Sequence, residues 1–354
     1  MSDRFDFIVV GGGVLGASSV LAVKEALPDA KIVWYTGTKE HTASNDFMKI
    51  IRDVYPDELT AQFANRALRT WTTDDLYRRN FHNPGWIRVL SDNETVNTAD
   101  TLLTTAEMVR RVGCTKPPIL NENEKLYLNP TVGYADSAQA VDDVAEMVEE
   151  RGVKVIRKNV TSFLVDGGEC LGVQVEDLFK ASGVSVGILD LRDEEFEELK
   201  DMPILVTDIG EVMLSHKKKV LKMTTTKTFM LNDPDRLPKA DTCYNRKVLE
   251  KVLPQFEGRE LRSFTCPDLL TPNQDPVIDH VPGAQGLVVA TGGSYHSFKF
   301  LPEIGKMVFL RIRNQEPGND VESELLQRWT WNRTGGGPHP VHELDEVGDI
   351  LLAC

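Results

Sequence analysis

A glycine-rich turn close to the N-terminus limits what this chain can fold into more than any other feature. A short β-branched run at 7–10 leads directly into the turn, a helix-forming segment follows at 17–27, and a second strand is expected at 31–35. In the pattern G-x-G-x-x-G, glycine permits the sharp turn, the approach of a pyrophosphate and close helix packing, while the positive end of the helix faces the phosphates. The sequence therefore predicts a dinucleotide site. Its expected contact residues are Gly11, Gly13, Val14 and Gly16.

The second strand lacks the acidic residue that usually ends it and binds a ribose hydroxyl. Tyr35 and Thr36 occupy that place. Three interpretations stay open. Thr36 supplies a neutral hydrogen bond, Glu40 reaches in from the following loop, or Lys39 assists a 2′-phosphate, which would indicate NADP.

The charge balance excludes several kinds of partner. The 40 Lys and Arg residues against 54 Asp and Glu leave a net charge of −14 over 354 residues. Binding to nucleic acid or to an anionic membrane is driven mainly by Lys and Arg, so neither is expected as a partner. No apolar run approaches the ~20 residues that are needed to cross a bilayer. With 41% apolar residues, the chain has ample length for two domains or one large interleaved body.

The cysteines favour reduced thiols in a cytosol-like compartment. Five cysteines are widely scattered and form no C-x-x-C pair, which argues against a disulfide framework and against a zinc site. Residues 351–354 form neither a prenylation box nor a Ser-Lys-Leu peroxisomal signal, and no signal peptide is recognisable. We therefore expect a cytoplasmic protein without a metal. The five cysteines are Cys114, Cys170, Cys243, Cys266 and Cys354.

Several elements are expected in the middle of the chain. Apolar residues recur every four positions over 58–77, which predicts one amphipathic helix. Ser137 is expected to cap a second helix that Gly152 ends. The glycines at 166–168 predict the turn of a hairpin, and the acid-dense segment 190–201 predicts a solvated helix face.

The segment 266–306 carries the most informative pattern. A buried strand expected at 287–290 ends abruptly at 291–294, where adjacent glycines let backbone amides approach a ligand closely. His296 and Lys299 follow, and Lys299 stands between two phenylalanines.

This segment resembles the C-terminal signature of the D-amino-acid-oxidase-like flavoenzymes, in the monomeric sarcosine oxidase and fructosyl amino acid oxidase (amadoriase) branch. That branch shows a Cys, a Thr-Pro turn, an Ile-Asp pair and a Gly-x-Ser-Gly-His-Gly-Phe-Lys-Phe block. A second similarity lies after the second strand, where the family contacts the flavin. The matching residues are Cys266, Thr271-Pro272, Ile278-Asp279 and 292–302, together with 43–46 and 49–52.

The resemblance implies a mixed α/β fold, with a Rossmann-like FAD-binding domain interleaved with a smaller antiparallel-sheet substrate domain. It also implies that FAD oxidises the C–N bond of a secondary amine or N-substituted amino acid, such as sarcosine, a fructosyl amino acid or a saccharopine-like compound. Hydride would pass to flavin N5, and oxygen would become hydrogen peroxide. The implied boundaries are 1–85, 135–180 and 260–354 for the FAD-binding domain, and 86–134 and 181–259 for the substrate-binding domain.

The same resemblance implies residues that bind the flavin. Cys266 matches a cysteine that commonly links to the flavin through its sulfur, since a thiolate can attack the electron-poor methyl group of the ring. A buried structural cysteine is the alternative. Lys49 and Arg52 match positions of positive charge, where cations stabilise the anionic reduced ring, and plain helix-surface charges are the alternative. The other implied contacts are Thr36, Ser44, Asn45, Gly293 and Ser294.

Other matched residues are implied in substrate binding and catalysis. Lys299 matches a lysine that holds the substrate carboxylate, although a lysine whose stem covers apolar surface is the alternative. Lys222 resembles a lysine that promotes oxygen reduction. His296 lies at the flavin edge or is a satisfied core histidine. Arg333, in a tail that starts at Arg328, matches an arginine that helps to bind carboxylate, and a surface arginine is the alternative.

The sequence also departs from the family pattern. Tyr295 and Ser297 stand where glycines are usual, and their bulk could narrow the pocket or press on the ring. After Val175 the chain lacks the buried run that ends in Ala-x-Gly-Ala-Trp, and it passes quickly to a strand at 186–189. That loss would expose a backbone edge and apolar surface, so another segment must replace the strand or the protein is impaired.

Two alternative functions follow from these departures. A nicotinamide-dependent Rossmann dehydrogenase is favoured by Thr36 and Lys39, and a degenerate flavin-fold protein without oxidase activity is favoured by the missing strand. The expected partners of an oxidase are a small amine or amino acid and molecular oxygen, and the protein is expected to be a monomer.

Overall fold

The computed structural model describes residues 4–37, 43–92, 94–174, 182–230, 241–271, 273–331 and 344–345. These residues divide into two units. The assignment of one unit to the flavin and the other to the substrate stays a prediction. Unit 1 contains the described residues of 4–81, 135–174 and 268–331, and unit 2 contains those of 82–134, 182–267 and 344–345.

The expected β-α-β start forms in unit 1. The strand β1 (Phe7–Val10) pairs in parallel with β2 (Ile32–Tyr35), which pairs in parallel with β9 (Lys154–Ile156). The helix α1 (Val14–Ala26) begins at the glycine turn itself rather than at residue 17. The earlier start follows from the Val14 N–H group, which already has a partner in the Ser44 hydroxyl oxygen at 3.0 Å.

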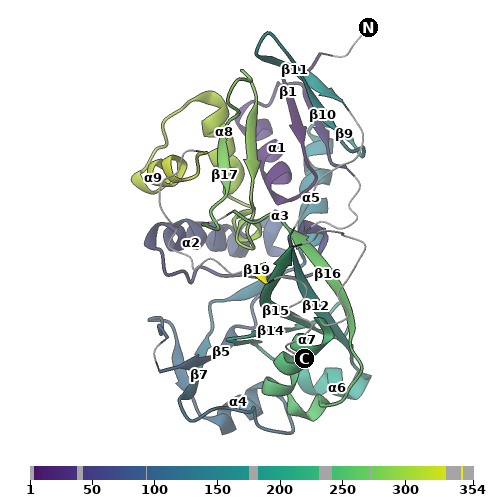
Figure 1. Ribbon diagram of the computed structural model, residues 1–354, viewed down its shortest axis with the longest axis vertical. Helices are drawn as coiled ribbons and strands as arrows, with labels where there is room; N and C mark the ends of the chain where they lie inside the picture. Colours follow the sequence, from purple (N-terminus) through teal and green to yellow (C-terminus); the bar gives the residue numbers. More distant parts are fainter. Residues whose placement is uncertain are drawn as a thin grey trace. The chain divides into compact units, whose positions relative to one another are not determined.

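The helix α1 packs closely against α8 (Ile304–Arg313), and Figure 1 shows α1 beside both β1 and α8. The Ser18 hydroxyl accepts a hydrogen bond from the Gly305 N–H group (2.7 Å) and donates one to the Leu301 carbonyl (2.6 Å). A Cβ atom at Gly305 would lie 2.0 Å from the Ser18 carbonyl oxygen. Glycine at this position therefore permits the approach of the two helices.

The prediction of one helix over 58–77 is wrong in its last turn. The helix α2 (Glu58–Thr73) ends because Asp74 takes an extended backbone, with φ −84° and ψ 131°. The Asp74 side chain then accepts a hydrogen bond from the Leu76 N–H group at 2.9 Å and caps a separate short helix, α3 (Asp75–Arg78). The buried residues of the predicted apolar stripe are Phe63, Ala67 and Trp71.

The predicted capping role of Ser137 is also wrong. The helix α5 (Ser137–Glu150) includes Ser137 as its first residue, and its N-cap is Asp136. The Ser137 hydroxyl instead donates a hydrogen bond to the Asp46 carbonyl. The end of this helix is as predicted, because Gly152 follows it in the left-handed region at φ 85°.

The predicted hairpin forms between β10 (Ser162–Asp166) and β11 (Glu169–Gln174). Gly167 and Gly168 make its turn at φ 56° and 82°, in the left-handed region that favours glycine. The hairpin exposes several large apolar side chains. They are Phe163, Leu164, Val165 and Leu171.

The strand β1 lies at an outer edge of the parallel sheet. Among the described residues β1 pairs with β2 alone, and β18 (Val288–Thr291) pairs instead with β17 (Val277–His280). Ile8 and Val10 of β1 are 42% and 38% exposed. The predicted loss of a strand falls on 175–181, outside the described residues. The loss of the strand and its consequences stay a prediction.

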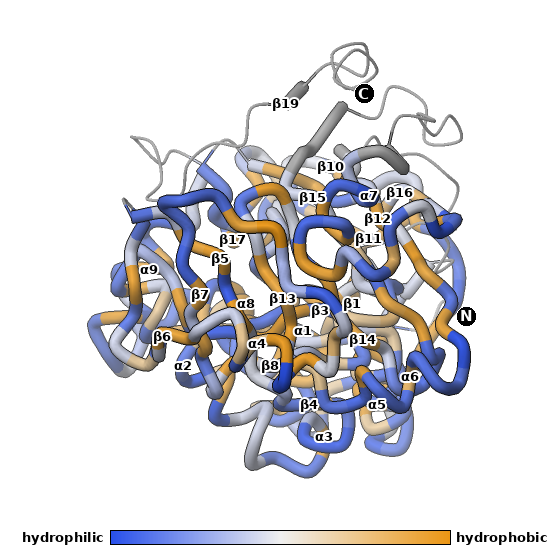
Figure 2. Tube along the Cα trace, turned by 90° about the horizontal axis from the view of Figure 1, so that it is seen from below, coloured by the Kyte–Doolittle hydropathy of each residue, from blue (hydrophilic) through white to orange (hydrophobic). Residues whose placement is uncertain are grey.

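Unit 2 is built on a nine-stranded sheet, counted over the residues that the structure describes. Its order is β16-β12-β15-β14-β13-β5-β7-β6, with β19 beside β15. Figure 2 colours the chain by hydropathy; the first three residues of β13 are hydrophobic, and Ile204 and Leu205 are buried, as expected for a central strand. The strands are β5 (Trp86–Ser91), β6 (Thr101–Leu103), β7 (Glu124–Asn129), β12 (Ser182–Asp190), β13 (Ile204–Thr207), β14 (Gly210–Ser215), β15 (Val220–Met230), β16 (Arg262–Asp268) and β19 (Leu344–Asp345).

One face of this sheet packs on helices. The helix α7 (Asp241–Val252) contacts β12, β14 and β15, and Figure 1 shows it against these strands. The acid-dense helix α6 (Asp193–Leu199) presents most of its acids to solvent as predicted, but Glu195 is buried. Burial raises the pKa of Glu195, but hydrogen bonds from Arg192 (2.6 Å) and Arg259 (2.8 Å) outweigh it and lower the pKa to about 2.

The remaining elements are short or peripheral. They are η1 (Ala43–Asn45), β3 (Lys49–Ile51), η3 (Ser297–Phe300) and α9 (Asp320–Arg328) in unit 1, α4 (Thr105–Val112) and η2 (Pro254–Phe256) in unit 2, and β4 (Phe81–His82) and β8 (Gly133–Ala135) where the chain passes between the units.

The contact of α1 with α8 generates a stability prediction. Replacing Gly305 by Ala forces the two backbones apart, and we expect a loss of about 1–3 kcal/mol in the free energy of unfolding. Urea unfolding followed by circular dichroism measures this loss. Gly318→Ala is the control, because no atom lies within 4 Å of its Cβ position, and it should change stability by less than ~0.5 kcal/mol. Equal stability of the two variants would contradict the packing described.

The buried carboxylate of Glu195 generates a pH prediction. Because its pKa in the folded protein is about 2, below the ordinary value, the stabilisation is complete above about pH 4.3 and is lost as the pH falls toward 2. Glu195→Gln should therefore lower the free energy of unfolding by about 3 kcal/mol at pH 7 and by progressively less at pH 4 and pH 3. The exposed Glu197 supplies the control Glu197→Gln. If the loss of unfolding free energy in Glu195→Gln did not depend on pH, the ion pairs of Glu195 would not be the cause of that loss.

Candidate functional site

The glycine turn forms a cradle in which added side chains would collide with backbone. Gly11 adopts φ +112°, and a Cβ atom at Gly12 would lie 2.2 Å from the Thr36 carbonyl oxygen. At Gly16 the corresponding atom would lie 1.9 Å from the Gly11 carbonyl oxygen. Gly13, the N-cap of α1, makes no side-chain cap, and the first turn contains no acidic residue. The positive end of the helix is thus available to an anion such as a pyrophosphate.

Thr36, at the end of β2, stands where an acidic residue usually binds a ribose hydroxyl. The Thr36 N–H group donates to the Ile156 carbonyl at 3.0 Å, and the buried Thr36 hydroxyl donates to the Gly37 carbonyl at 3.4 Å. The hydroxyl is therefore directed at its own loop. Lys39 and Glu40 lie outside the described residues.

The segment after β2 brings one of its two predicted flavin contacts to the turn. The Ser44 hydroxyl accepts the Val14 N–H group, and a Cβ atom at Gly13 would lie 3.1 Å from it. Asn45 is exposed in the same short helix η1. The structure thus places Ser44 against the start of α1.

Lys49 and Arg52 are held by residues close to them in the chain. The Lys49 ammonium lies 3.2 Å from the Asp46 carboxylate, whose side chain is 2% exposed. The Arg52 guanidinium lies 4.5 Å from the centre of the Tyr55 ring and donates to the Val54 carbonyl. Burial raises the pKa of Tyr55 to about 12, against the lowering effect of Arg52. The side chains of Lys49 and Arg52 are thus held in place by these neighbours.

The turn after β18 is unusual because two residues other than glycine take the left-handed conformation. Gly292 has φ 71°, and Ser294 and Tyr295 follow at φ 46° and 64°. The buried Ser294 hydroxyl donates to the Gly292 carbonyl (3.0 Å) and accepts the Thr271 N–H group (3.0 Å). The turn is therefore fastened to the Thr-Pro segment that the sequence singles out.

Lys299 and His296 follow this turn. The Lys299 ammonium donates to the Tyr295 carbonyl at 2.7 Å, and the Lys299 carbonyl accepts the indole N–H group of Trp71 at 2.9 Å. His296 Nε2 lies 3.1 Å from Gln274 Oε1. Lys299 is half-buried, which fits both a carboxylate ligand and a lysine whose stem covers apolar surface.

Lys222 and Cys266 belong to unit 2. Lys222 is 2% exposed in the middle of β15, where it pairs with Ile188 and Met213 on the neighbouring strands. Its side chain alternates with those of Leu221 and Met223, which belong to the core under the helices, so Lys222 lies on the opposite face of the sheet. Cys266 is a buried cysteine in β16 that forms no disulfide.

The arginine that opens the C-terminal tail is engaged within unit 1. Arg328 lies 2.9 Å from Asp57 and 3.0 Å from Asp275, and it donates to the Thr60 hydroxyl at 2.8 Å. It therefore joins α9 to the start of α2 and to the turn before β17. Arg333, the predicted carboxylate ligand, lies outside the described residues.

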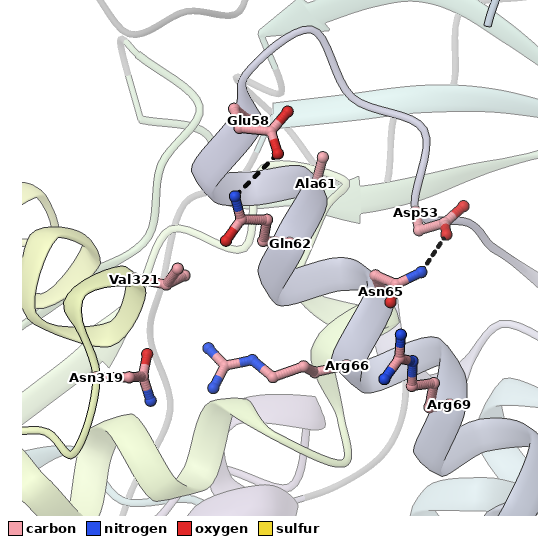
Figure 3. Close-up of a pocket in the computed structure, with 9 residues that line it drawn as sticks. All are labelled: Asp53, Glu58, Ala61, Gln62, Asn65, Arg66, Arg69, Asn319 and Val321. Carbon is pink, nitrogen blue, oxygen red and sulfur yellow. Dashed lines mark hydrogen bonds between the residues drawn. The ribbon is translucent and has the colours of Figure 1, made fainter. Parts of the chain in front are cut away.

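A separate groove of about 480 Å³ lies along α2. Figure 3 shows Arg66 reaching across it toward Asn319 and Val321, while Glu58–Gln62 and Asp53–Asn65 hydrogen bonds occupy its far side. Arg66 also pairs with Glu322 at 2.8 Å. None of the predicted site residues lines this groove. Its lining residues are Asp53, Glu58, Ala61, Gln62, Asn65, Arg66, Arg69, Asn319 and Val321.

Among the residues that the structure describes, no group of three or more His, Cys, Asp or Glu side chains could hold a metal ion. No described helix is both long enough and apolar enough to span a bilayer.

Sequence comparison identifies the family. The family model described as "FAD dependent oxidoreductase" matches residues 6–309. The chain belongs to this family. Its cofactor is FAD, which sets the nicotinamide alternative aside, and the resemblance seen in the sequence is confirmed.

Individual relatives agree with the family match. The L-saccharopine oxidase of Schizosaccharomyces pombe is 24% identical over 413 residues, which cover 92% of each chain. The fructosamine oxidase Amadoriase II of Aspergillus fumigatus has a similar structure, with a TM-score of 0.80, 18% identity and coverage of 99% of this chain and 97% of its own. Fructosyl peptide oxidase from E. terrenum gives a TM-score of 0.79 and 19% identity over 98% and 97% of the two chains. These structures confirm the predicted mixed α/β fold class.

The residues of unit 1 fit FAD. The cradle from Gly11 to Gly16 lacks side chains, and the N-cap Gly13 makes no side-chain hydrogen bond at the helix end, as a bound pyrophosphate requires. The Ser297 hydroxyl is buried and has no hydrogen-bond partner among the described residues, and a Cβ atom at Gly293 would lie 3.7 Å from it. Buried hydroxyls are rarely left unpaired, so this donor is suited to a bound group. The individual contacts stay predictions.

Asp268 was not among the predicted site residues. Its carboxylate accepts the N–H group of Tyr295 at 2.7 Å, and the charges of both Lys49 and Lys299 act on it. The available signal was its place two residues after Cys266 and three residues before Thr271 of the Thr-Pro segment.

Proposed function

We propose that this FAD-dependent oxidoreductase oxidises the C–N bond of a secondary amine or an N-substituted amino acid that carries a carboxylate. Bound FAD would supply the acceptor for the hydride that leaves the carbon next to the nitrogen. The balanced reaction converts the amine, one oxygen molecule and one water molecule into a carbonyl compound, the released amine and hydrogen peroxide. The names of the relatives, which are oxidases of saccharopine and of fructosyl compounds, support this substrate class.

The position of Lys299 is the observation that carries the proposal. The Tyr295 carbonyl binds the ammonium of the half-buried Lys299 on the turn after β18, and the residues on either side of Lys299 in the chain, Phe298 and Phe300, are buried. A point charge in such surroundings is little screened and attracts a carboxylate strongly. Lys299 therefore binds the substrate carboxylate and orients the amine.

Two residues of unit 2 have separate roles in the proposal. Lys222 holds an amine group in a buried sheet position, where a positive charge would stabilise the reduction of oxygen. Cys266 supplies a buried thiol for a covalent link to the flavin. Neither role affects the orientation of the substrate.

Purified protein tests the proposal through its flavin and its peroxide. A panel of N-substituted amino acids under air should release hydrogen peroxide, and precipitation with acid should leave yellow colour in the pellet of the wild-type protein. Cys266→Ser should move that colour to the supernatant. Cys114→Ser, at another buried free cysteine, is the matched control and should keep it in the pellet. A flavin-loaded protein that releases no peroxide with any member of the panel would instead indicate a flavin-fold protein without oxidase activity.

The role of Lys299 is tested by its removal. Lys299→Met should raise KM for a carboxylate substrate about 10- to 100-fold, because a charge-assisted hydrogen bond contributes about 1.5–3 kcal/mol. The same substrate as its methyl ester should be oxidised equally by variant and wild type. Lys306→Met removes an exposed lysine that pairs with Glu303, and should leave KM unchanged. Equal losses for acid and ester would refute carboxylate binding by Lys299.

A further inference from the structure

The turn that carries Lys299 is held in a conformation that its own residues disfavour. Ser294 and Tyr295 lie consecutively in the left-handed region, at φ 46° and 64°. For residues other than glycine such a conformation costs on the order of 1–3 kcal/mol each, and it persists only where the surroundings impose it. Some neighbouring group must therefore stabilise this turn.

The end of β16 supplies that group. One oxygen of Asp268 accepts the Tyr295 N–H group at 2.7 Å, and the other accepts the Leu269 N–H group at 2.8 Å. The Leu269 carbonyl accepts the Ser294 N–H group at 3.1 Å. Asp268 and Leu269 thus bind the N–H groups of both left-handed residues, and hydrogen bonds to a charged carboxylate are the stronger kind.

One residue, Tyr295, connects Asp268 to Lys299. Tyr295 donates its N–H group to Asp268, while its carbonyl accepts the Lys299 ammonium at 2.7 Å. A rotation of Tyr295 out of the left-handed region would move that carbonyl and so displace the ammonium. The position of Lys299 therefore depends on the conformation of Tyr295.

Burial and the neighbouring groups act in opposite directions on Asp268. Burial raises the pKa of Asp268, and it outweighs the positive charges of Lys49 and Lys299 and the two backbone N–H groups, which lower the pKa. Lys49 is also paired with Asp46, at 3.2 Å. An isosteric amide would lose both the charge and one acceptor oxygen.

We propose that Asp268 is a positioning residue, which holds Tyr295 in its left-handed conformation and thereby fixes the ammonium of Lys299 for the carboxylate of the substrate. This inference rests on the proposed carboxylate-binding role of Lys299. It assigns no proton transfer to Asp268.

A double-mutant cycle with glycine separates this role from a general structural one. Glycine adopts φ 64° without strain, so Tyr295→Gly should make the anchor dispensable. In the flavin-loaded protein, Asp268→Asn should weaken the binding of acetate, followed by the flavin absorbance spectrum, about tenfold, which corresponds to about 1.4 kcal/mol. Addition of Asp268→Asn to Tyr295→Gly should weaken acetate binding less than twofold. An equal loss in the two backgrounds would overturn the proposal.

Hydrogen exchange followed by mass spectrometry supplies a measurement that needs no activity. Asp268→Asn should speed exchange in peptides that contain Tyr295, and unchanged exchange there would overturn the anchor whatever the enzyme oxidises. Faster exchange with unchanged acetate affinity would overturn the link to Lys299. If Asp268→Asn alone does not fold, recovery of folding in Asp268→Asn/Tyr295→Gly supports the proposal, and failure of both overturns it. Absence of amine oxidation by the wild type would refute the proposed function and leave the exchange result intact.

Discussion

The hydroxyl of Ser18 joins two helices whose residues are far apart in the sequence. It accepts the N–H group of Gly305 and donates to the carbonyl of Leu301, over separations of 287 and 283 residues. Unit 1 consequently forms only when its last segment returns to its first. The glycine cradle at the start of α1 and the Lys299 turn just before α8 are held in one unit by this contact, and close packing at Gly305 leaves it little freedom.

The β-α-β start of unit 1 could be predicted from the sequence because residues close together in the chain determine it. The glycine pattern after a β-branched strand predicts the β-α-β start, and the cradle at Gly12 and Gly16 shows the steric reason for the pattern. The break of α2 at Asp74 was not predictable from apolar periodicity, since the stripe continues through Leu76 while the capping side chain ends the helix. The capping role predicted for Ser137 was wrong for a similar reason, because its hydroxyl donates to the Asp46 carbonyl, which is distant in the sequence.

In the candidate site too, features set by neighbouring residues could be predicted, and contacts with distant parts of the chain could not. Glycines after a strand predict a sharp break at 291–294, but the sequence cannot show that Ser294 and Tyr295 take the left-handed conformation, since the carboxylate that binds the Tyr295 N–H group comes from another strand. The sequence predicts Arg333 as a carboxylate ligand, in a tail that Arg328 opens. Only the structure shows that Arg328 is already engaged by Asp57 and Asp275.

Part of the acidic excess behind the net charge of −14 lies next to cations of unit 1. Three cations of unit 1 have acidic neighbours: Lys49 has Asp46, Lys299 is influenced by Asp268, and Arg328 has Asp57 and Asp275. Acidic residues thus fix the directions of the positive groups and offset their field at long range. A polyanion needs many cations along a surface, whereas a small ligand with one carboxylate needs a single oriented ammonium. The acidity of the chain is therefore compatible with an anionic substrate because its positive charges act only at contact distance.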